Sequence, residues 1–322
     1  YVHIPFCISK CKYCDFISFA CNNQKTEEYF EVLTREIESK KDCTNKEITT
    51  IYIGGGTPSV PDSKYIVEII NSIKNTFKIA KECEITIEVN PGTVTKEKLL
   101  DYKKAGVNRI SIGLQSTSDR ILKLLGRIHN YEQFIYTYNL AKDAGYNNIN
   151  IDLMLGIPTQ TESELVDSIE KIIKLNPNHI SIYSLIVEEN TEMQRLIDSN
   201  ELELPEENIE RKMYWKTKKI LEKNGFKQYE ISNFAKKGYE SRHNLDCWNQ
   251  EEYAGMGLAA HSYIDRKRFS NIDNIDEYIK NKNNLNKNIV VNEIQKKEDQ
   301  AKEYMMIGFR KIDGISISEF ER

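Results

Sequence analysis

Short runs of β-branched and apolar residues alternate with amphipathic segments along the first 187 residues. Residues 26–41 place apolar side chains at positions 29, 30, 33 and 37 with charged residues between them, the spacing of an amphipathic helix. Residues 48–53 (ITTIYI) are instead typical of a buried strand. The pattern predicts strands at 2–4, 48–53, 84–89, 109–114, 148–154 and 179–185. Helices are predicted at 26–41, 63–77, 95–105, 119–125, 131–144 and 162–175.

The alternation predicts an α/β protein with a parallel sheet, because the connections are long enough to be crossovers and the strands are too short for a sandwich. We expect a TIM-like (β/α)6 barrel that is not fully closed, with a doubly wound open sheet as the alternative. The barrel is favoured because residues 7–14, 54–56 and 88–92, Gln115 and Asp152 lie at or just beyond the carboxyl ends of successive strands. Active sites of β/α barrels form at that rim, whereas an open sheet gathers them at one switch point.

The β/α alternation fades from about residue 188. We therefore predict a barrel core at residues 1–187 and a smaller α+β region at residues 188–322. The second region is predicted to contain a helix at 206–224, a strand at 226–231, a Gly- and aromatic-rich passage at 241–263, a solvated surface loop at 280–288 and a helix at 298–309.

The composition is that of a water-soluble globular protein, with 39% apolar and 29% charged residues. The net charge of −4 argues against a large nucleic-acid footprint, so no nucleic-acid partner is expected. Seven cysteines, an odd number, do not form the pattern of a secreted disulfide framework, and no signal peptide precedes the first of them. We expect a reducing, cytoplasmic location.

Three cysteines, Cys7, Cys11 and Cys14, form a CxxxCxxC loop directly behind the first predicted strand. Three thiolates can hold three irons of a cubane cluster and leave the fourth iron open for another ligand. Zinc is the competing interpretation, but a structural zinc site takes four ligands at paired spacings, and no second cysteine pair occurs in the chain. Three unrelated buried cysteines are the structural alternative.

Polar and glycine residues follow several of the other predicted strands. The run from Gly54 to Pro58 lets a ligand approach the backbone, and it fits neither the dinucleotide nor the P-loop motif. Glu88, Gln115, Arg127 and Asp152 stand among apolar neighbours and offer two carboxylates, an amide and a guanidinium. Each alone is better explained by a structural role, but together they suit a zwitterionic, nucleoside-like ligand.

Seven sequence motifs carry a family resemblance that covers nearly the whole chain: YVHIPFCxxxCxYC, YIGGGTPS, EVNPG, SIGLQS, LGRIH, DLMLGIP and HNLDCW. In this order they resemble the radical S-adenosylmethionine (SAM) proteins of the group that contains HemN, the oxygen-independent coproporphyrinogen III dehydrogenase, and the heme chaperone HemW. The resemblance implies that the three cysteines bind a [4Fe–4S] cluster whose open iron is chelated by SAM. It implies SAM contacts for Tyr1, Tyr13, Gly55, Gly56, Thr57, Glu88, Gln115, Arg127 and Asp152.

Two features decide between the branches of this group. The HemN motif continues as CxxxCxxCxC, whereas Phe16 stands two residues after Cys14, which is similar to HemW. The segment from His243 to Trp248 is similar to the HNxxYW heme motif of HemW, so His243 is implied as an iron ligand and Trp248 as a porphyrin contact. Cys247 stands where that motif has tyrosine. We interpret this cysteine as a packing replacement, with iron ligation as the alternative.

The resemblance thus implies a heme chaperone that binds heme and transfers it to acceptor hemoproteins. Its implied cofactors are a [4Fe–4S] cluster, SAM and heme, and its implied partners include a low-potential electron donor. It also allows a homodimer and peripheral membrane contact through the acceptors. The alternative function is the radical oxidative decarboxylation of coproporphyrinogen III, so whether the chain is an enzyme stays open at this point.

Overall fold

The computed structural model of the chain describes residues 1–320. Its main sheet begins with six parallel strands in chain order, each paired with the next. They are β1 (Val2–Ile4), β4 (Ile48–Gly55), β5 (Ile79–Val89), β6 (Arg109–Gln115), β7 (Asn148–Leu155) and β8 (His179–Ser184). This confirms the predicted parallel β/α architecture; β5 begins five residues earlier than its predicted start at residue 84.

Two later strands extend this sheet with antiparallel pairing. β10 (Asn233–Ala235) pairs with β8, and β9 (Lys227–Glu230) pairs with β10. The strand order β1-β4-β5-β6-β7-β8-β10-β9 leaves β1 and β9 at the two edges, so the sheet is open, as expected. Because β9 and β10 come after residue 187 yet belong to this sheet, the division of the chain at that residue stays a prediction.

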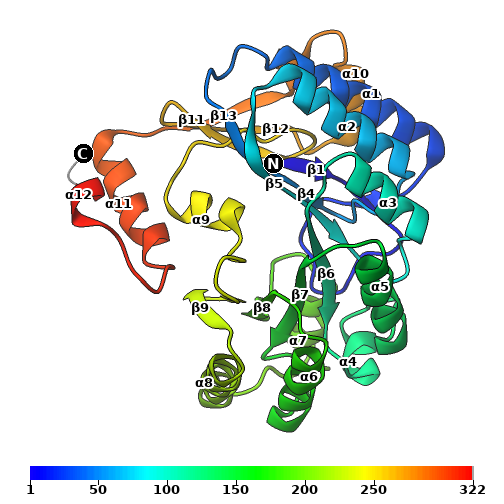
Figure 1. The fold of residues 1–322 in the computed structure, drawn as a ribbon, viewed down its shortest axis with the longest axis vertical. Helices are drawn as coiled ribbons and strands as arrows, with labels where there is room; N and C mark the ends of the chain where they lie inside the picture. Colours follow the sequence, from blue (N-terminus) through cyan, green and yellow to red (C-terminus); the bar gives the residue numbers. More distant parts are fainter. Residues whose placement is uncertain (321–322) are drawn as a thin grey trace.

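Six helices cover the outer face of the sheet (Figure 1): α1 (Asn23–Ser39), α2 (Ser63–Thr76), α3 (Lys96–Lys104), α4 (Asp119–Leu124), α5 (Tyr131–Asp143) and α6 (Glu162–Lys174). Side-chain oxygens of Asn22, Thr95, Asn130 and Thr161 accept hydrogen bonds from first-turn N–H groups at four of their N-termini. Their apolar faces pack on alternate strand residues such as Ile51 and Ile53 to form the core.

The opposite face of the strands is polar. Because side chains alternate along a strand, Thr50 and Tyr52 point away from the side on which Ile51 and Ile53 are buried. Strand register places the following residues on this same inner face: Thr50, Tyr52, Glu84, Thr86, Glu88, Arg109, Ser111, Asn150, Asp152, His179 and Ser181. The inside of the barrel is therefore lined by hydrogen-bonding and charged groups.

The C-terminal region adds further helices and a second sheet. The antiparallel sheet contains β11 (His261–Ile264), β12 (Lys267–Asn271) and β13 (Ile289–Ile294). The helices are α7 (Glu192–Asp198), α8 (Glu207–Lys223), α9 (Arg242–Trp248), α10 (Ile275–Lys280), α11 (Lys297–Gly308) and α12 (Ile317–Phe320). Near the N-terminus, β2 (Phe6–Cys7) and β3 (Phe19–Ala20) form a separate short parallel pair. Within residues 1–320, no helix combines the length and apolar content that crossing a bilayer takes.

The predicted loop at residues 280–288 needs a correction. Its last four residues form a 3-10 helix, Leu285–Asn288, and Asn288 is buried, accepting a hydrogen bond from Asn281 and donating one to the carbonyl of Tyr278. The Lys/Asn composition indicates that the segment as a whole is solvated. It does not reveal that the side chain of Asn288 is hydrogen-bonded to the backbone of α10.

Glu36 of α1 joins the barrel to the C-terminal region. Its buried carboxylate accepts hydrogen bonds from the backbone N–H of Gly257 at 2.9 Å, from Asn271 at 2.7 Å and from the hydroxyl of Tyr278. A buried carboxylate is tolerated only when it has such partners. Together with the backbone hydrogen bonds of Met256 to Tyr1 and His3, this residue fixes how the segment around Gly257 packs against the barrel.

Candidate functional site

The cysteine loop lies between β2 and β3 and is held in place by its backbone. The N–H of Gly56 donates to the carbonyl of Ile4, and the N–H of Thr57 donates to that of Phe6, which fixes the beginning of the loop on the end of β4. Further along, the N–H of Lys12 donates to the carbonyl that precedes Gly126, and the Lys12 carbonyl accepts from the first turn of α7. The loop is thus anchored to three separate elements around the barrel rim.

Cys7, Cys11 and Cys14 are all free thiols, partly buried, and line one cavity of about 460 Å³. Cys7 Sγ lies 3.4 Å from the hydroxyl of Thr57, and Arg127 Nη1 donates to Cys11 Sγ at 3.5 Å. Burial raises the pKa of Cys14 to about 11. A thiol in such a place becomes a thiolate when a metal ion supplies the compensating charge.

Two glycines bring the end of β4 close to the cysteine loop. Gly55 has a φ of +111°, and a Cβ there would lie 2.6 Å from the ring of His3. A Cβ at Gly56 would lie 3.1 Å from Cys7 Sγ. Both glycines line the cavity; a side chain at Gly56 would extend toward Cys7, whereas one at Gly55 would clash with His3.

Two partly buried carboxylates face the same cavity from β5 and β7, the two strands that flank β6. Glu88, next to last in β5, accepts a hydrogen bond from the hydroxyl of Tyr52 at 2.7 Å and one from the N–H of Gly55 at 3.3 Å. Burial raises its pKa to about 7. Asp152 accepts from Ser111 and Asn150, and burial likewise raises the pKa of its carboxyl. Contrary to the sequence prediction, Asp152 lies three residues before the end of β7, inside the barrel instead of at its rim.

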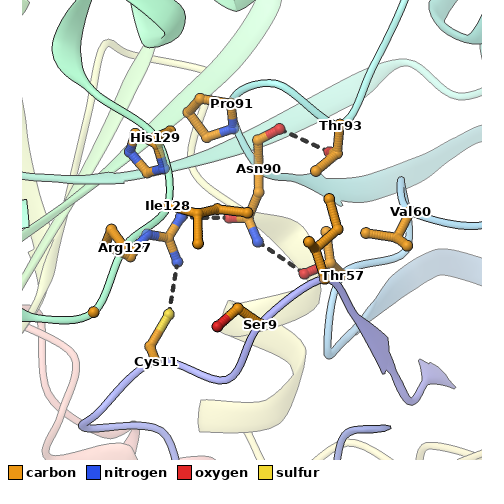
Figure 2. A pocket seen from close by; sticks show the side chains of 12 residues that line it. Ser9, Cys11, Thr57, Val60, Asn90, Pro91, Thr93, Arg127, Ile128 and His129 are labelled. Carbon is orange, nitrogen blue, oxygen red and sulfur yellow. Dashed lines mark hydrogen bonds between the residues drawn. The ribbon is translucent and has the colours of Figure 1, made fainter. Parts of the chain in front are cut away.

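Arg127 connects the cysteine loop with the end of β5, as Figure 2 shows. Its guanidinium donates to Cys11 Sγ, to the side-chain carbonyl of Asn90 at 2.7 Å and to the backbone carbonyl of Gly113 at 2.7 Å. The amide of Asn90 in turn donates to Thr57 at 2.8 Å. A depression of about 20 Å³, room for about one water molecule, lies beside this network. The network holds a positive charge next to the cysteines.

Gln115 ends β6 in an unusual backbone conformation. Its φ is +66°, a strained value for a residue with a side chain, and it coincides with a register shift between β6 and β7. The side chain is buried and hydrogen-bonded to Tyr183, while its Oε1 has no hydrogen-bond partner. An unpaired buried acceptor lining a cavity is a group that a ligand donor can satisfy.

Eleven predicted site residues line this single cavity: Cys7, Cys11, Tyr13, Cys14, Gly55, Gly56, Thr57, Glu88, Gln115, Arg127 and Asp152. Tyr1 is not among the residues that line it. Its hydroxyl is 3.1 Å from the Nδ1 atom of His3, and its ring stacks on that of Tyr52, with centroids 6.3 Å apart.

His243 and Trp248 lie together on α9, which is on the side of the sheet away from α3 and α5 (Figure 1). The His243 ring stacks on Tyr52 with centroids 4.9 Å apart, and its Nδ1 is 3.1 Å from Thr50 Oγ1. Burial lowers the pKa of His243 to about 3, and nearby positive charges, Arg109 among them, add to the shift. The imidazole is therefore neutral, the form that ligates iron, and Nε2 is the nitrogen left for that role.

The structure also adds residues to the site that the sequence did not suggest. Tyr183, Ser232 and Arg310 line the cavity, as does Asn90, which lies in the predicted rim segment 88–92. Tyr183 stands at a strand end within the barrel pattern and could have been found there. Ser232 and Arg310 belong to the C-terminal region, where the sequence pattern did not predict that any residue lies at the rim.

The geometry of the cysteines bears on the kind of metal they could hold. Within residues 1–320, no three His, Cys, Asp or Glu side chains converge as the ligands of one metal ion would. In a cubane cluster each thiolate binds a different iron, so the sulfurs need only surround a common volume. Three free thiols around one cavity fit that group.

The comparisons agree with this picture. A family model of the radical SAM superfamily matches residues 1–172. A protein of *Bacillus subtilis* named heme chaperone HemW is 37% identical over 99% of this chain and 85% of its own length. The *Escherichia coli* protein of the same name is 38% identical over 82% of this chain and 69% of its own length. The chain belongs to the HemW family of radical SAM proteins.

Membership in the radical SAM superfamily implies a [4Fe–4S] cluster and SAM. The solved structure of HemN from *Escherichia coli*, described as a radical SAM coproporphyrinogen III oxidase, has a TM-score of 0.86 and covers 100% of this chain and 77% of its own. At 21% identity this likeness shows the fold alone. It supports the open β/α barrel and the arrangement of the C-terminal region around it.

Proposed function

We propose that this HemW family protein binds heme and passes it to acceptor hemoproteins. The observation that carries the proposal is the similarity over nearly the whole chain to relatives named heme chaperone HemW. A specific residue agrees with it: Phe16, which lines the cavity, occupies the position that is cysteine in the HemN motif.

We propose that Cys7, Cys11 and Cys14 hold the [4Fe–4S] cluster. When bound, the cluster supplies an electron at low potential to the sulfonium of SAM. Arg127, beside Cys11, offsets negative charge at the thiolates. The hydrogen bonds from Arg127 to Asn90 and from Asn90 to Thr57 hold that guanidinium in position.

Around this centre the rim residues suit the charges of SAM. The Glu88 carboxylate can accept from the N–H of its amino group, and the Asp152 carboxylate can accept from ribose hydroxyls. Gly55 and Gly56 leave the edge of β4 open to the ligand, and Gln115 offers an unpaired acceptor. These assignments rest on the shared cavity and on the donor and acceptor types.

His243 and Trp248 are proposed to contact heme. The neutral imidazole supplies a ligand for iron, and the indole supplies an apolar surface for the porphyrin. His243 lies against Tyr52 and is not among the residues that line the cavity of the cysteines. Cys247, partly buried on the same helix, keeps its proposed role as a packing residue.

Heme titration of the reconstituted protein tests this proposal. The wild-type protein is expected to show a saturable Soret band, and His243→Ala is expected to weaken binding or to change the spectrum of the ligated iron. His261→Ala is the matched control, because His261 is exposed on β11. Absence of heme binding, or a His243→Ala spectrum identical to that of the wild type, would remove the support for this function.

The dehydrogenase activity of HemN is the alternative, because the chain shares that fold. Coproporphyrinogen III, SAM and a reductant would be supplied to the reconstituted protein under anaerobic conditions. We expect no protoporphyrinogen above a cluster-free control. Its formation at a catalytic rate would show that the chain is an enzyme, whatever the outcome of the heme titration.

A further inference from the structure

Arg310 stands where the cavity meets the helix that carries His243 and Trp248. It follows α11 in the chain, and its side chain lines the same cavity as the three cysteines. The guanidinium carbon lies 4.4 Å from the centroid of the Trp248 ring. A cation and a large aromatic surface are thus adjacent at this end of the cavity.

The guanidinium is incompletely paired. Its Nη2 donates to the carboxylate of Glu230 at 3.5 Å, the outer limit of a hydrogen bond, and its Nε has no hydrogen-bond partner. Glu230 is fully buried, and its other oxygen accepts from the N–H of Ser232 at 2.7 Å and from Asn233 at 2.6 Å. Glu230 therefore anchors Arg310 through one long contact, without the bidentate geometry that would saturate a guanidinium.

Arg310 differs in this respect from Arg127, another cation of the cavity. The Nε of Arg127 also has no hydrogen-bond partner, but both of its terminal nitrogens donate to protein atoms, namely to Cys11, Asn90 and a backbone carbonyl. Arg310 instead keeps donor capacity beside an indole ring. A guanidinium of this kind binds a carboxylate in a planar, paired geometry that lysine cannot reproduce.

We infer that Arg310 and Trp248 form a subsite for a carboxylate-bearing tetrapyrrole, in which Arg310 pairs with a propionate and the indole contacts the adjacent macrocycle. This inference rests on the proposed heme function and adds to it a residue that determines which porphyrins bind. It also places the bound tetrapyrrole at the end of the cavity that the cysteines line.

Binding of protoporphyrin IX and of its dimethyl ester tests the subsite. Both lack iron, so ligation by His243 does not contribute, and the ester lacks the carboxylates. We expect Arg310→Gln to weaken binding of the diacid about tenfold or more and to leave binding of the ester nearly unchanged. Arg310→Lys should recover part of the loss, since it keeps the charge but not the paired geometry.

Lys311→Gln is the matched control. Lys311 is the adjacent cation, is partly exposed and donates to Asn249, so its loss should affect neither ligand. The comparison of acid with ester is made within each purified protein, so a change in the stability of a variant does not alter the ratio of the two dissociation constants. SAM also carries a carboxylate, and its affinity is expected to be equal in the wild type and Arg310→Gln.

If Arg310→Gln loses affinity equally for the diacid and the ester, or for neither, the Arg310 subsite is wrong. Heme binding by the wild type would not be affected by that result. Weaker SAM binding in Arg310→Gln with unchanged porphyrin binding would also overturn the subsite, because the carboxylate recognised would then be that of SAM. Failure of the wild type to bind heme or protoporphyrin IX would contradict both this subsite and the proposed function.

Discussion

The protonation of Glu88 should control the affinity for SAM near neutral pH. Burial raises the pKa of this carboxyl from 4.5 to about 7, because the charged form loses its hydration. The nearby charge of Asp152 raises it further, while the hydrogen bond from Tyr52 opposes the shift. Only the ionised carboxylate accepts a charge-assisted hydrogen bond from the amino N–H of the ligand, so affinity should rise as the pH rises through the pKa.

The size of the effect follows from the ionised fraction. With a pKa of about 7, Glu88 is about 10% ionised at pH 6 and about 90% ionised at pH 8, which predicts roughly ninefold tighter binding at pH 8. With its ordinary pKa, the carboxyl would be about 97% ionised at pH 6, and the affinity would hardly change. His129 and His243, whose pKa values are lowered to about 3, stay neutral throughout this range.

Isothermal titration calorimetry of the anaerobically reconstituted protein between pH 6 and 8 measures this dependence. Glu88→Gln should bind SAM more weakly and without the pH dependence. Tyr52→Phe removes the donor that stabilises the carboxylate, so its midpoint should lie about one to two pH units higher. A wild-type affinity that is constant from pH 6 to 8, or wild-type affinity in Glu88→Gln, would refute the reasoning.

Three further substitutions test other parts of the structure. Cys11→Ala should abolish the brown chromophore and the EPR signal of the reduced cluster; an unchanged spectrum would exclude the proposed ligand set. Gly55 has a φ of +111°, and a Cβ there would lie 2.6 Å from His3, so Gly55→Ala should lower the free energy of unfolding by about 2–3 kcal/mol. Gly92→Ala is the control and should lower it by less, because no atom lies within 4 Å of the added methyl. Glu36→Ala leaves three donors unpaired and should lower the free energy of unfolding, measured in urea, by about 3 kcal/mol. A loss below about 1 kcal/mol would show that Glu36 does not join the two regions.

The sequence predicts the barrel better than the region that closes it. Strand β4 and helix α1 carry their own patterns, a β-branched run and an amphipathic period, and these need no distant partner to be recognised. Helix α9 has no such pattern in its seven residues. Its first N–H groups donate to Glu84, about 158 positions earlier in the chain, so its position depends on a contact that local sequence does not contain.

The same distinction applies to the site. The cysteines and Glu88 follow strands or lie at their ends, and the carboxyl ends of parallel strands meet at one rim, so their convergence was predictable. Arg310 and Ser232 reach the cavity because β10 and β9 extend the sheet and bring the segment after α11 against it. The placement of these two residues depends on strand pairing between distant segments. Arg310 also lies in no recognisable motif, so the sequence did not predict its position.

The proposed delivery of heme is measured most directly by its transfer to an acceptor hemoprotein. Heme-loaded protein would be mixed with increasing amounts of an apo b-type cytochrome, and the acceptor's Soret band followed over time. A chaperone hands over heme within a complex, so we predict that the transfer rate rises with acceptor concentration and saturates. A rate independent of acceptor concentration and equal to the rate of heme release into buffer would contradict the claim.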